Sequence, residues 1–354
     1  MSIVAETYRY VIGVDTHAQQ HTYVIVEAAT GVQIDHRQFP TTPAGLLRAS
    51  DWIARRTGAV TAGDLTLVLI SMEGTRSYGA QAAVLLAHRG YRVVDAPSPK
   101  RHRGSGKDDH LDALAAARGA LPKDTARLAD ARAGQTSSML QILLTARSSI
   151  TGERTRAINA LTALLRTHSL GVDARRKPTR QQVRAIALWR TRGSDDPVQA
   201  VARNEARRLA RAIIELDAQA TTNEQALLQA VTSAAPSLLE LPGVGPVNAA
   251  IVMTAWSHPG RVHSAAAFAK LAGACPLKIE SGNTTNHRLN RSGDRQLNRA
   301  LHSIANTRML HDDKTRHYVA RRTTEGLTKP RIRRCLKRAI AGQLFRHLEQ
   351  LHTT

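Results

Sequence analysis

Aromatic residues are scarce in this sequence of 354 residues and make up only 3% of it. Stacking of bases on aromatic platforms is therefore a poor candidate for its main mode of nucleic-acid binding. Cys275 and Cys335 are the only cysteines, which excludes a disulfide framework and a zinc site of the CxxC type and suits a reducing cytoplasm. No apolar run reaches the roughly 18 residues that a membrane span needs. The first six residues lack the pattern of a signal peptide.

Acidic residues are few compared with basic ones. Lys and Arg number 50 and Asp and Glu number 28, so the formal net charge is 50 − 28 = +22 and the isoelectric point is near 11.1. This charge favours a polyanionic partner, and nucleic acid is the first candidate. A ribosome-associated or membrane-surface protein is the alternative. Hydrophobic residues at 42% suffice for real cores, and the length suits two or three domains.

The first 122 residues predict a mixed α/β domain. Three strands separated by short turns indicate an antiparallel meander, and a helix follows with Leu46, Leu47 and Ile53 as core positions. The resulting order, β-β-β-α-β-α-β-α, is that of a ribonuclease-H-like domain. The predicted strands are 8–14, 22–27, 32–39, 65–70 and 91–95, and the predicted helices are 43–57, 78–89 and one that follows the basic loop 100–107.

Four acidic residues fall at the ends of these elements. Asp15 ends the first strand, Glu73 ends the fourth, and Asp109 and Asp112 lie three apart on one face of the last helix. Open sheets hold their sites at such strand ends. Carboxylates gathered there favour Mg²⁺, with Mn²⁺ as the alternative, and two such ions can clamp a phosphoryl transfer. Taken singly, each acid is better explained as a surface charge or a helix cap, and only the four together favour a metal site. We interpret Asp108 as the N-terminal residue of the helix.

Residues 123–235 predict a helical arm with breaks at 171–178 and 193–197. Between Arg147 and Arg211 there are fifteen Lys and Arg against five Asp and Glu. A basic helical arm suits oligomerisation and binding of a phosphate backbone, and a solvated charged spacer is an equal alternative. The apolar spacing is not a regular heptad, so it does not indicate a long coiled coil.

Residues 236–354 predict a mainly helical domain. Its Pro-Gly-Val-Gly-Pro turn at 242–246 resembles a helix-hairpin-helix, in which Gly243 and Gly245 would let backbone N–H groups approach a phosphate. A tight connection between helices is the alternative. Further helices are expected at 263–272, 294–310 and 329–350. The last of these is predicted to point Ile332, Cys335, Leu336 and Ile340 inward.

Ser281 lies before a glycine in what we interpret as a polar loop and is followed by several arginines. A serine hydroxyl beside guanidinium groups is what attack on a phosphodiester needs, because the guanidinium groups stabilise the charge of the transition state. A capping serine with solvated arginines is the alternative. Two of the arginines are expected to share a helical face. The arginines are Arg288, Arg291, Arg295 and Arg299.

These segments together resemble the DEDD-type insertion-sequence transposases of the IS-one-ten type, which are RNA-guided serine recombinases. The matching segments follow the same order along nearly the whole chain. They are Gly13-Val14-Asp15-Thr16-His17, Met72-Glu73-Gly74-Thr75, Gly106-Lys107-Asp108-Asp109-His110-Leu111-Asp112-Ala113, Leu241-Pro242-Gly243-Val244-Gly245-Pro246, Ser281-Gly282, His287-Arg288-Leu289-Asn290-Arg291 and Gly293-Asp294-Arg295-Gln296-Leu297.

The resemblance implies a RuvC-like domain (1–122), a helical arm (123–235) and a C-terminal transposase domain (236–354). It implies metal binding by Asp15, Glu73, Asp109 and Asp112 and nucleophilic attack by Ser281. Nucleic acid would be held by Lys107, Gly243, Gly245 and the four arginines. This sequence departs from the family pattern in two places, with Asp108 before the third acid and Glu280 before the serine.

The implied partners are DNA at the element ends and target, a structured noncoding guide RNA, and further copies of the chain in a dimer or tetramer. No membrane is implied, and the protein is expected in the bacterial cytoplasm with the nucleoid. Three rival hypotheses remain from the residues themselves. They are a metal-dependent RuvC-like endonuclease that acts by hydrolysis, a non-enzymatic nucleic-acid-binding protein, and an RNA chaperone.

Overall fold

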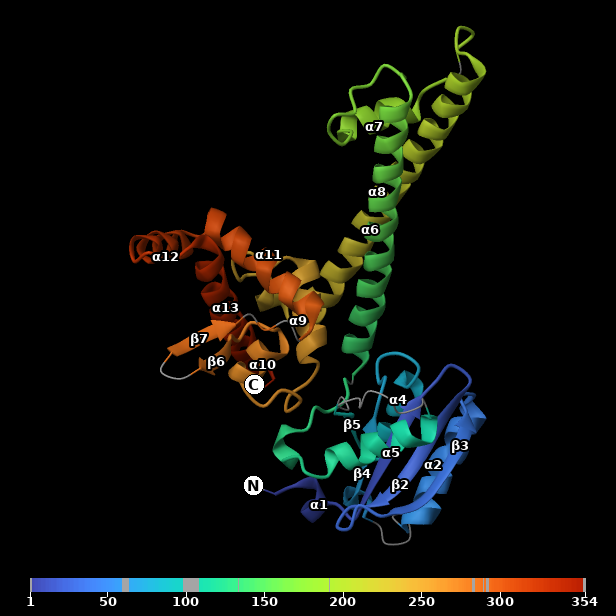
Figure 1. The fold of residues 1–354 in the computed structure, drawn as a ribbon, viewed down its shortest axis with the longest axis vertical. Coiled ribbons are helices and arrows are strands. Elements are labelled where there is room, and N and C mark those ends of the chain that lie inside the picture. Colours follow the sequence, from blue (N-terminus) through green and yellow to red (C-terminus); the bar gives the residue numbers. More distant parts are fainter. Residues whose placement is uncertain are drawn as a thin grey trace. The chain divides into compact units, whose positions relative to one another are not determined.

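The computed structural model describes residues 2–58, 64–97, 108–132, 134–190, 192–281, 284–288, 290 and 293–352, and only the backbone of 277–281 and 284–288. The chain divides into two compact units (Figure 1). Unit 1 is Met1–Gly134 with Trp256–Leu271, and unit 2 is Gln135–Ala255 with Ala272–Thr354. A segment from the second half of the sequence therefore belongs to the N-terminal unit.

Unit 1 is built on a five-stranded mixed sheet. Its strands lie in the order β3-β2-β1-β4-β5. The first three strands pair antiparallel, and β1 pairs parallel with β4, which pairs parallel with β5. The predicted meander is confirmed. The strands are β1 (Tyr10–Thr16), β2 (Gln20–Glu27), β3 (Gln33–Pro40), β4 (Val68–Met72) and β5 (Arg92–Asp95).

Helices cover both faces of this sheet. On one face α2 (Pro43–Thr57) and α4 (Ala80–His88) pack into a buried apolar cluster, and on the other face α1 (Val4–Thr7) and α5 (Asp109–Ala120) pack into a second one. This is the ribonuclease-H/RuvC-like arrangement expected from the sequence. Short 3-10 turns lie at Leu65–Leu67 and Thr125–Arg127.

One predicted core position of α2 is wrong. Leu46 and Ile53 are buried, but Leu47 is 41% exposed. The buried positions of α2 follow the spacing of one helical face, and a residue directly after Leu46 lies about 100° round the helix. Hydrophobic character alone could not distinguish the two leucines.

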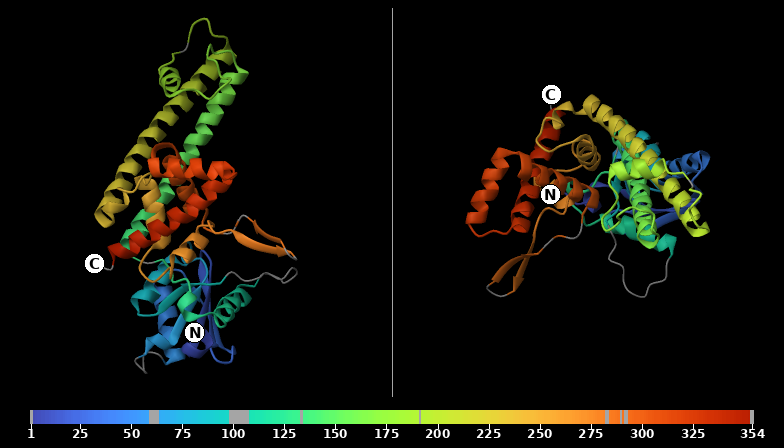
Figure 2. Two further views of the ribbon diagram at one scale, coloured as in Figure 1. Left: turned by 90° about the vertical axis from the view of Figure 1, so that its left-hand side faces the viewer. Right: turned by 90° about the horizontal axis from the view of Figure 1, so that it is seen from above.

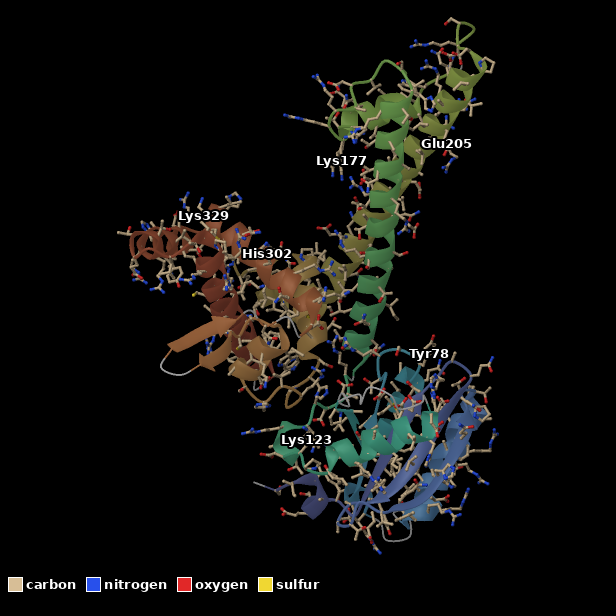
Figure 3. The ribbon with its side chains drawn as sticks, viewed as in Figure 1. Tyr78, Lys123, Lys177, Glu205, His302 and Lys329 are labelled. Carbon is tan, nitrogen blue, oxygen red and sulfur yellow. The ribbon has the colours of Figure 1, made fainter. Side chains whose placement is uncertain are left out.

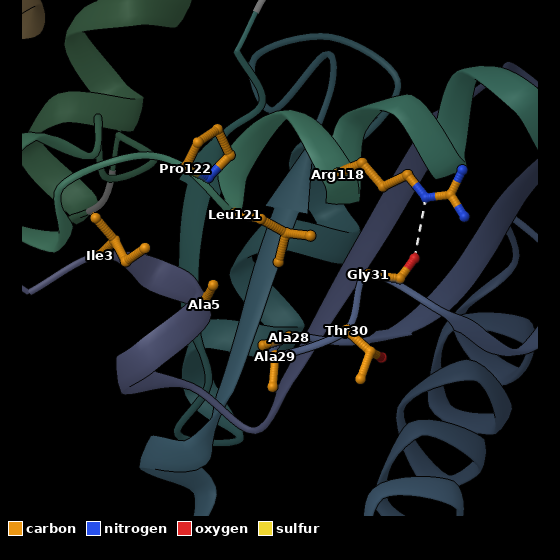
Figure 4. Close-up of a pocket in the computed structure, with 9 residues that line it drawn as sticks. All are labelled: Ile3, Ala5, Ala28, Ala29, Thr30, Gly31, Arg118, Leu121 and Pro122. Atoms are coloured by element: carbon orange, nitrogen blue, oxygen red, sulfur yellow. Dashed lines mark hydrogen bonds between the residues drawn. The ribbon is translucent and has the colours of Figure 1, made fainter.

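A hydrogen bond joins the C-terminal end of α5 to the turn between β2 and β3. Arg118 Nε donates to Gly31 O at 3.1 Å across a pocket of about 560 Å³ (Figure 4). The pocket is lined mainly by apolar and small side chains, including Ile3 and Leu121. None of its described lining residues is acidic, so these residues do not offer the chemistry of a metal site.

Unit 2 contains a helical arm of α6 (Gln135–Thr167), α7 (Arg180–Ala187) and α8 (Pro197–Ala234). The two long helices lie side by side along the arm (Figure 2). Capping boxes begin α7 and α8, with Thr179 and Asp196 as the N-cap residues. The predicted break at 171–178 is confirmed, since it falls between α6 and α7, and the break at 193–197 is confirmed up to Pro197, which is the first residue of α8.

The remainder of the second half is mainly helical, as predicted. The C-terminal helix buries Ile332, Leu336 and Ile340, but Cys335 is exposed, so that predicted inward position is wrong. Among the described residues, no helix has the length and apolar character needed to cross a membrane. The elements are a 3-10 turn (Pro236–Leu238), α9 (Pro246–Trp256), α10 (Ala265–Leu271), β6 (Leu277–Ser281), β7 (Thr284–Arg288), α11 (Arg295–His311), α12 (Asp313–Thr324) and α13 (Lys329–Leu351).

Candidate metal centre

The carboxyl end of β1 and the first turn of α5 bring Asp15 and Asp109 together. Asp15 is the penultimate residue of β1 and is 7% exposed. Asp109 is the first residue of α5 and is half-buried. The preceding residue, Asp108, accepts a hydrogen bond from His110 N at 2.9 Å and so caps the helix. The interpretation of Asp108 as a helix N-terminal residue is confirmed.

His17 lies between these two carboxylates. Its Nε2 is 2.9 Å from Asp15 Oδ2 and 3.1 Å from Asp109 Oδ1. One potential ligand atom from each residue lies within 4.8 Å of the others. Sequence reasoning noted His17 only as the point where the strand ends. The signal that could have found it is the spacing Asp-x-His, because residues two apart in extended chain point to the same side.

The carboxylates repel one another electrostatically. Burial raises the pKa of Asp15, the charges of Asp109 and Asp112 raise it further, and the interaction with His17 opposes the rise. Asp112 thus acts on Asp15 through its charge, although it is not part of the group of ligand atoms within 4.8 Å. A bound cation would relieve this repulsion.

Glu73 is held by its backbone at the same edge of the sheet. Val14 pairs with Met72 in the parallel register of β1 and β4, and Glu73 N donates to Val14 O at 3.0 Å. Thr16 Oγ1 donates to Glu73 O at 3.1 Å. Glu73 therefore follows the end of β4 directly beside the end of β1, but its carboxylate is outside the three-residue group.

Small residues allow α5 to approach the sheet closely. A Cβ atom added to Gly13 would lie 1.9 Å from Ala113 O, and Ala113 and Ala117 are fully buried. Ser71 Oγ, on β4, donates to Ala116 O at 2.7 Å. These contacts fix α5 across β1 and β4, and the position of α5 sets the distance from Asp109 to Asp15.

The donor set fits a divalent cation. Asp15 and Asp109 supply the carboxylate oxygens that Mg²⁺ and Mn²⁺ prefer, and His17 adds an imidazole nitrogen, a donor suited to transition metals. The low exposure of Asp15 and the crowding of negative charge are the features that a cation would compensate.

The region around Ser281 contains a β-hairpin where a polar loop was predicted. Ser281 is the last residue of β6 and pairs with Thr284 of β7, so the loop prediction is wrong at this position. Arg288 ends β7. The side chains of both residues lie outside the described part of the structure, as do Lys107 and Arg291 entirely.

The helix after this hairpin begins where the sequence predicted. Asp294 caps α11 by accepting hydrogen bonds from Gln296 N and Leu297 N at 2.9 and 3.0 Å. Arg295 and Arg299 are exposed and lie one turn apart on α11. The structure therefore leaves both guanidinium groups accessible to a phosphate.

The glycine turn packs against α11. Gly243 has φ +75°, and a Cβ atom there would lie 3.1 Å from Ile304 O. Arg308 Nε donates to Pro242 O at 2.7 Å. A Cβ atom at Gly245 would meet no described atom within 4 Å. Gly243 is therefore needed for packing of the turn, whereas Gly245 leaves its backbone open to an approaching group.

Comparison with known protein families gives two matches. A model described as Transposase IS116/IS110/IS902 family matches residues 235–320, and a model of the DEDD transposase of IS110 matches residues 12–169. A search of curated proteins found no match. The two matched segments contain the acidic cluster and Ser281. The chain belongs to the IS110 family of DEDD-type insertion-sequence transposases and is therefore an enzyme that acts on DNA.

Proposed function

We propose that this transposase cuts and rejoins DNA through a phosphoserine intermediate at Ser281. Asp15, Glu73, Asp109 and Asp112 are the proposed metal-binding carboxylates. The observation that carries the metal-binding part of the proposal is the group formed by Asp15, His17 and Asp109 at the carboxyl end of β1, because a cation would relieve the repulsion between the two carboxylates. His17 is added to the proposed ligands on its distances to the two carboxylates.

The proposed reaction exchanges one phosphoester for another. The Ser281 hydroxyl oxygen attacks a DNA phosphorus and loses its proton, and the bond from phosphorus to the 3′ oxygen breaks. The departing oxygen takes up a proton and becomes a 3′ hydroxyl. Attack of a 3′ hydroxyl on the phosphoserine then rejoins DNA and restores the serine without net hydrolysis.

A cation bound by the carboxylates would supply Lewis-acid stabilisation of the phosphate charge. The basic side chains of this chain have a separate role in holding the DNA phosphate. Arg295 and Arg299 are exposed on one face of α11 and suit this contact. The other proposed contacts to nucleic acid are Lys107, Gly243, Gly245, Arg288 and Arg291.

The proposal includes guidance by a structured noncoding RNA. The net charge of +22 supports simultaneous binding of RNA and DNA, and the family resemblance supports base pairing as the source of sequence specificity. The same proposal includes action as a dimer or tetramer. It also includes the division of the chain into three domains, with boundaries after residues 122 and 235. The protein would act in the bacterial cytoplasm, at the nucleoid.

A hydrolytic RuvC-like endonuclease is the second candidate. The observation that favours it is that Asp15, His17 and Asp109 all belong to unit 1, whereas Ser281 belongs to unit 2. In this candidate a water molecule attacks the phosphorus, and no bond to the protein forms.

Covalent trapping distinguishes the two candidates. The purified protein is incubated with the noncoding RNA that flanks the element, Mg²⁺ and labelled element-end DNA, then denatured and examined for label on the protein. We expect a labelled adduct that is lost in Ser281→Ala and in Asp109→Asn. Asp108→Asn is the matched control, because asparagine keeps the cap of α5 and the adduct should remain.

Free cleaved DNA without an adduct, unchanged in Ser281→Ala, would reject the phosphoserine mechanism and support hydrolysis. Retention of the adduct in Asp109→Asn together with its loss in Asp108→Asn would reassign the metal ligand to Asp108. Mn²⁺ in place of Mg²⁺ tests the choice of ion in the same assay.

A further inference from the structure

The arm contains a pocket remote in sequence from the proposed metal ligands and from Ser281. It has a volume of about 580 Å³ and is formed by the middle of α6, the facing part of α8 and the start of α7. All of its described lining residues from α7 and α8 lie between the two segments that the family models match. Four arginines line it, namely Arg147, Arg154, Arg180 and Arg184.

The two arginines of α6 are paired with acids of α8. Arg147 Nη2 lies 2.9 Å from Glu224 Oε2, and its Nη1 donates to Ala220 O at 3.1 Å. Arg154 forms an ion pair with Asp217. These pairs join the two long helices and neutralise two of the four positive charges in the pocket.

The two arginines of α7 differ from those of α6 in their partners. Arg180 and Arg184 lie one helical turn apart, and both are exposed. Neither forms an ion pair with an acid in the part of the chain that the structure describes. Among the described lining residues, four arginines and two acids leave a formal charge of +2, and Arg180 and Arg184 of α7 are the arginines that carry it.

The inner wall of the pocket is apolar. Val183 and Ile213 are buried, and Ile158 and Pro178 complete this side. Charged groups beside an apolar wall interact more strongly with an anion than they do in open water. Charged side chains are also dense around the arm, where Lys177 precedes α7 and Glu205 lies on α8 (Figure 3).

We propose that this pocket binds a phosphodiester group of a nucleic-acid backbone through Arg180 and Arg184. Within the described residues these two guanidinium groups have no acidic partner, and their fork-shaped N–H groups can donate hydrogen bonds to phosphate oxygens. The ion pairs of Arg147 and Arg154 hold the two walls in place. The inference requires only that the protein binds nucleic acid, and it is independent of the phosphoserine step.

The test measures binding of the full-length protein to two probes across a range of salt concentrations. The probes are a fluorescein-labelled DNA duplex and an RNA duplex of the same sequence. We expect Arg180→Gln with Arg184→Gln to weaken binding of at least one probe about tenfold. The slope of log K against log salt should fall by about 0.9 for each phosphate that the variant no longer neutralises.

The matched control is Arg156→Gln with Arg176→Gln. Both residues are exposed in the arm and lie outside the pocket, so the double variant has the same net charge as the test variant. We expect its affinity to stay within about twofold of wild type, because separated surface charges are screened by salt. Glutamine keeps a helix propensity close to that of arginine, so α7 should remain folded.

A second variant keeps the test decisive if the glutamine variant is unstable. Arg180→Lys with Arg184→Lys retains both charges and should retain the salt slope while losing part of the affinity. Weaker binding of the RNA duplex alone identifies an RNA backbone, weaker binding of the DNA duplex alone identifies a DNA backbone, and weaker binding of both identifies a shared site. Equal weakening in the test and control variants, or no weakening in either, would overturn the proposal.

Discussion

At the scale of single residues, Asp15 carries a charge that the fold disfavours in the absence of a cation. Burial is the main reason that its pKa is raised, and Asp109 and Asp112 add to the rise. A carboxyl group whose pKa is raised in the folded state contributes stability below its unfolded pKa and loses that contribution as pH rises through the folded pKa. As pH rises above 3.8, the raised pKa of Asp15 therefore lowers the stability of the metal-free protein.

The first prediction concerns Asp15→Asn. In the presence of a chelator near pH 7 this variant should have a higher free energy of unfolding than wild type, because asparagine removes the buried charge and still accepts a hydrogen bond from His17. The gain should shrink as pH falls toward 3.8, the ordinary pKa of the group. Urea unfolding at several pH values measures this change.

The same variant should lose metal binding. Mg²⁺ should raise the melting temperature of wild type, whereas its apparent affinity for Asp15→Asn should fall by about tenfold or more. If Mg²⁺ stabilises both proteins equally at the same concentration, Asp15 is not a ligand. An unchanged or lower stability of the variant in chelator would contradict the electrostatic account.

At the scale of elements, the contact of α5 with β1 sets the geometry of the acidic cluster. Val11, Gly13 and Asp15 alternate along β1 on the side facing α5, and Asp109 begins that helix. Any side chain at Gly13 meets the backbone of α5, which cannot move aside as a flexible side chain could. The proposed metal binding and the packing of α5 therefore depend on the same close approach.

The second prediction is that Gly13→Ala destabilises unit 1 by about 3 kcal/mol, at the upper end of overpacking costs. The added Cβ atom would lie 1.9 Å from Ala113 O, so α5 must shift and Asp109 must move away from Asp15. Urea unfolding measures the stability, and calorimetric titration with Mn²⁺ measures the loss of metal affinity.

Gly119→Ala is the control for this substitution. Gly119 lies in the same helix, and a Cβ atom there would be 3.9 Å from its nearest neighbour in Pro97. Alanine at a compatible helical position should stabilise the protein by about 0.4–1 kcal/mol. Equal effects of the two alanines would contradict the close-approach argument.

At the scale of the whole molecule, the chain returns to its N-terminal unit after the arm. Residues 256–271 belong to unit 1, although the residues on both sides of them belong to unit 2. Arg261 is 7% exposed and lies 3.5 Å from Asp95, which also accepts a hydrogen bond from Thr75. His258 Nε2 lies 3.2 Å from Ala131 O.

The third prediction is that a fragment of residues 1–134 is less stable than the same fragment joined to 256–271 by a Gly/Ser linker. The free energies of unfolding of the two fragments should differ by about 1.5–3 kcal/mol, which is the contribution of a hydrogen bond to a charged group. The shorter fragment lacks this contribution because Asp95 has lost its contact with Arg261. Denaturant unfolding of the two fragments measures it. Arg261→Ala in the joined fragment should remove part of the gain, and equal midpoints for all three would show that the segment contributes nothing.

Much of the fold was predictable because local signals agree with one another. The strand pattern with short turns predicted the meander, and helix caps such as Asp294 predicted where helices begin. The predictions for Leu47 and Cys335 were wrong because which face of a helix is buried depends on its partners. The β6–β7 hairpin was missed because its strands are polar, although Gly-Asn between them is a hairpin signature.

The sequence by itself determined that the protein is a transposase that acts on DNA, because acidic residues at strand ends, basic residues in excess and the family segments are all properties of residue type and order. Only the tertiary structure placed His17 between Asp15 and Asp109 and left Glu73 and Asp112 outside that group. It also assigned residues 256–271 to the N-terminal unit. These outcomes depend on contacts between residues far apart in the chain, and local propensity does not encode such contacts.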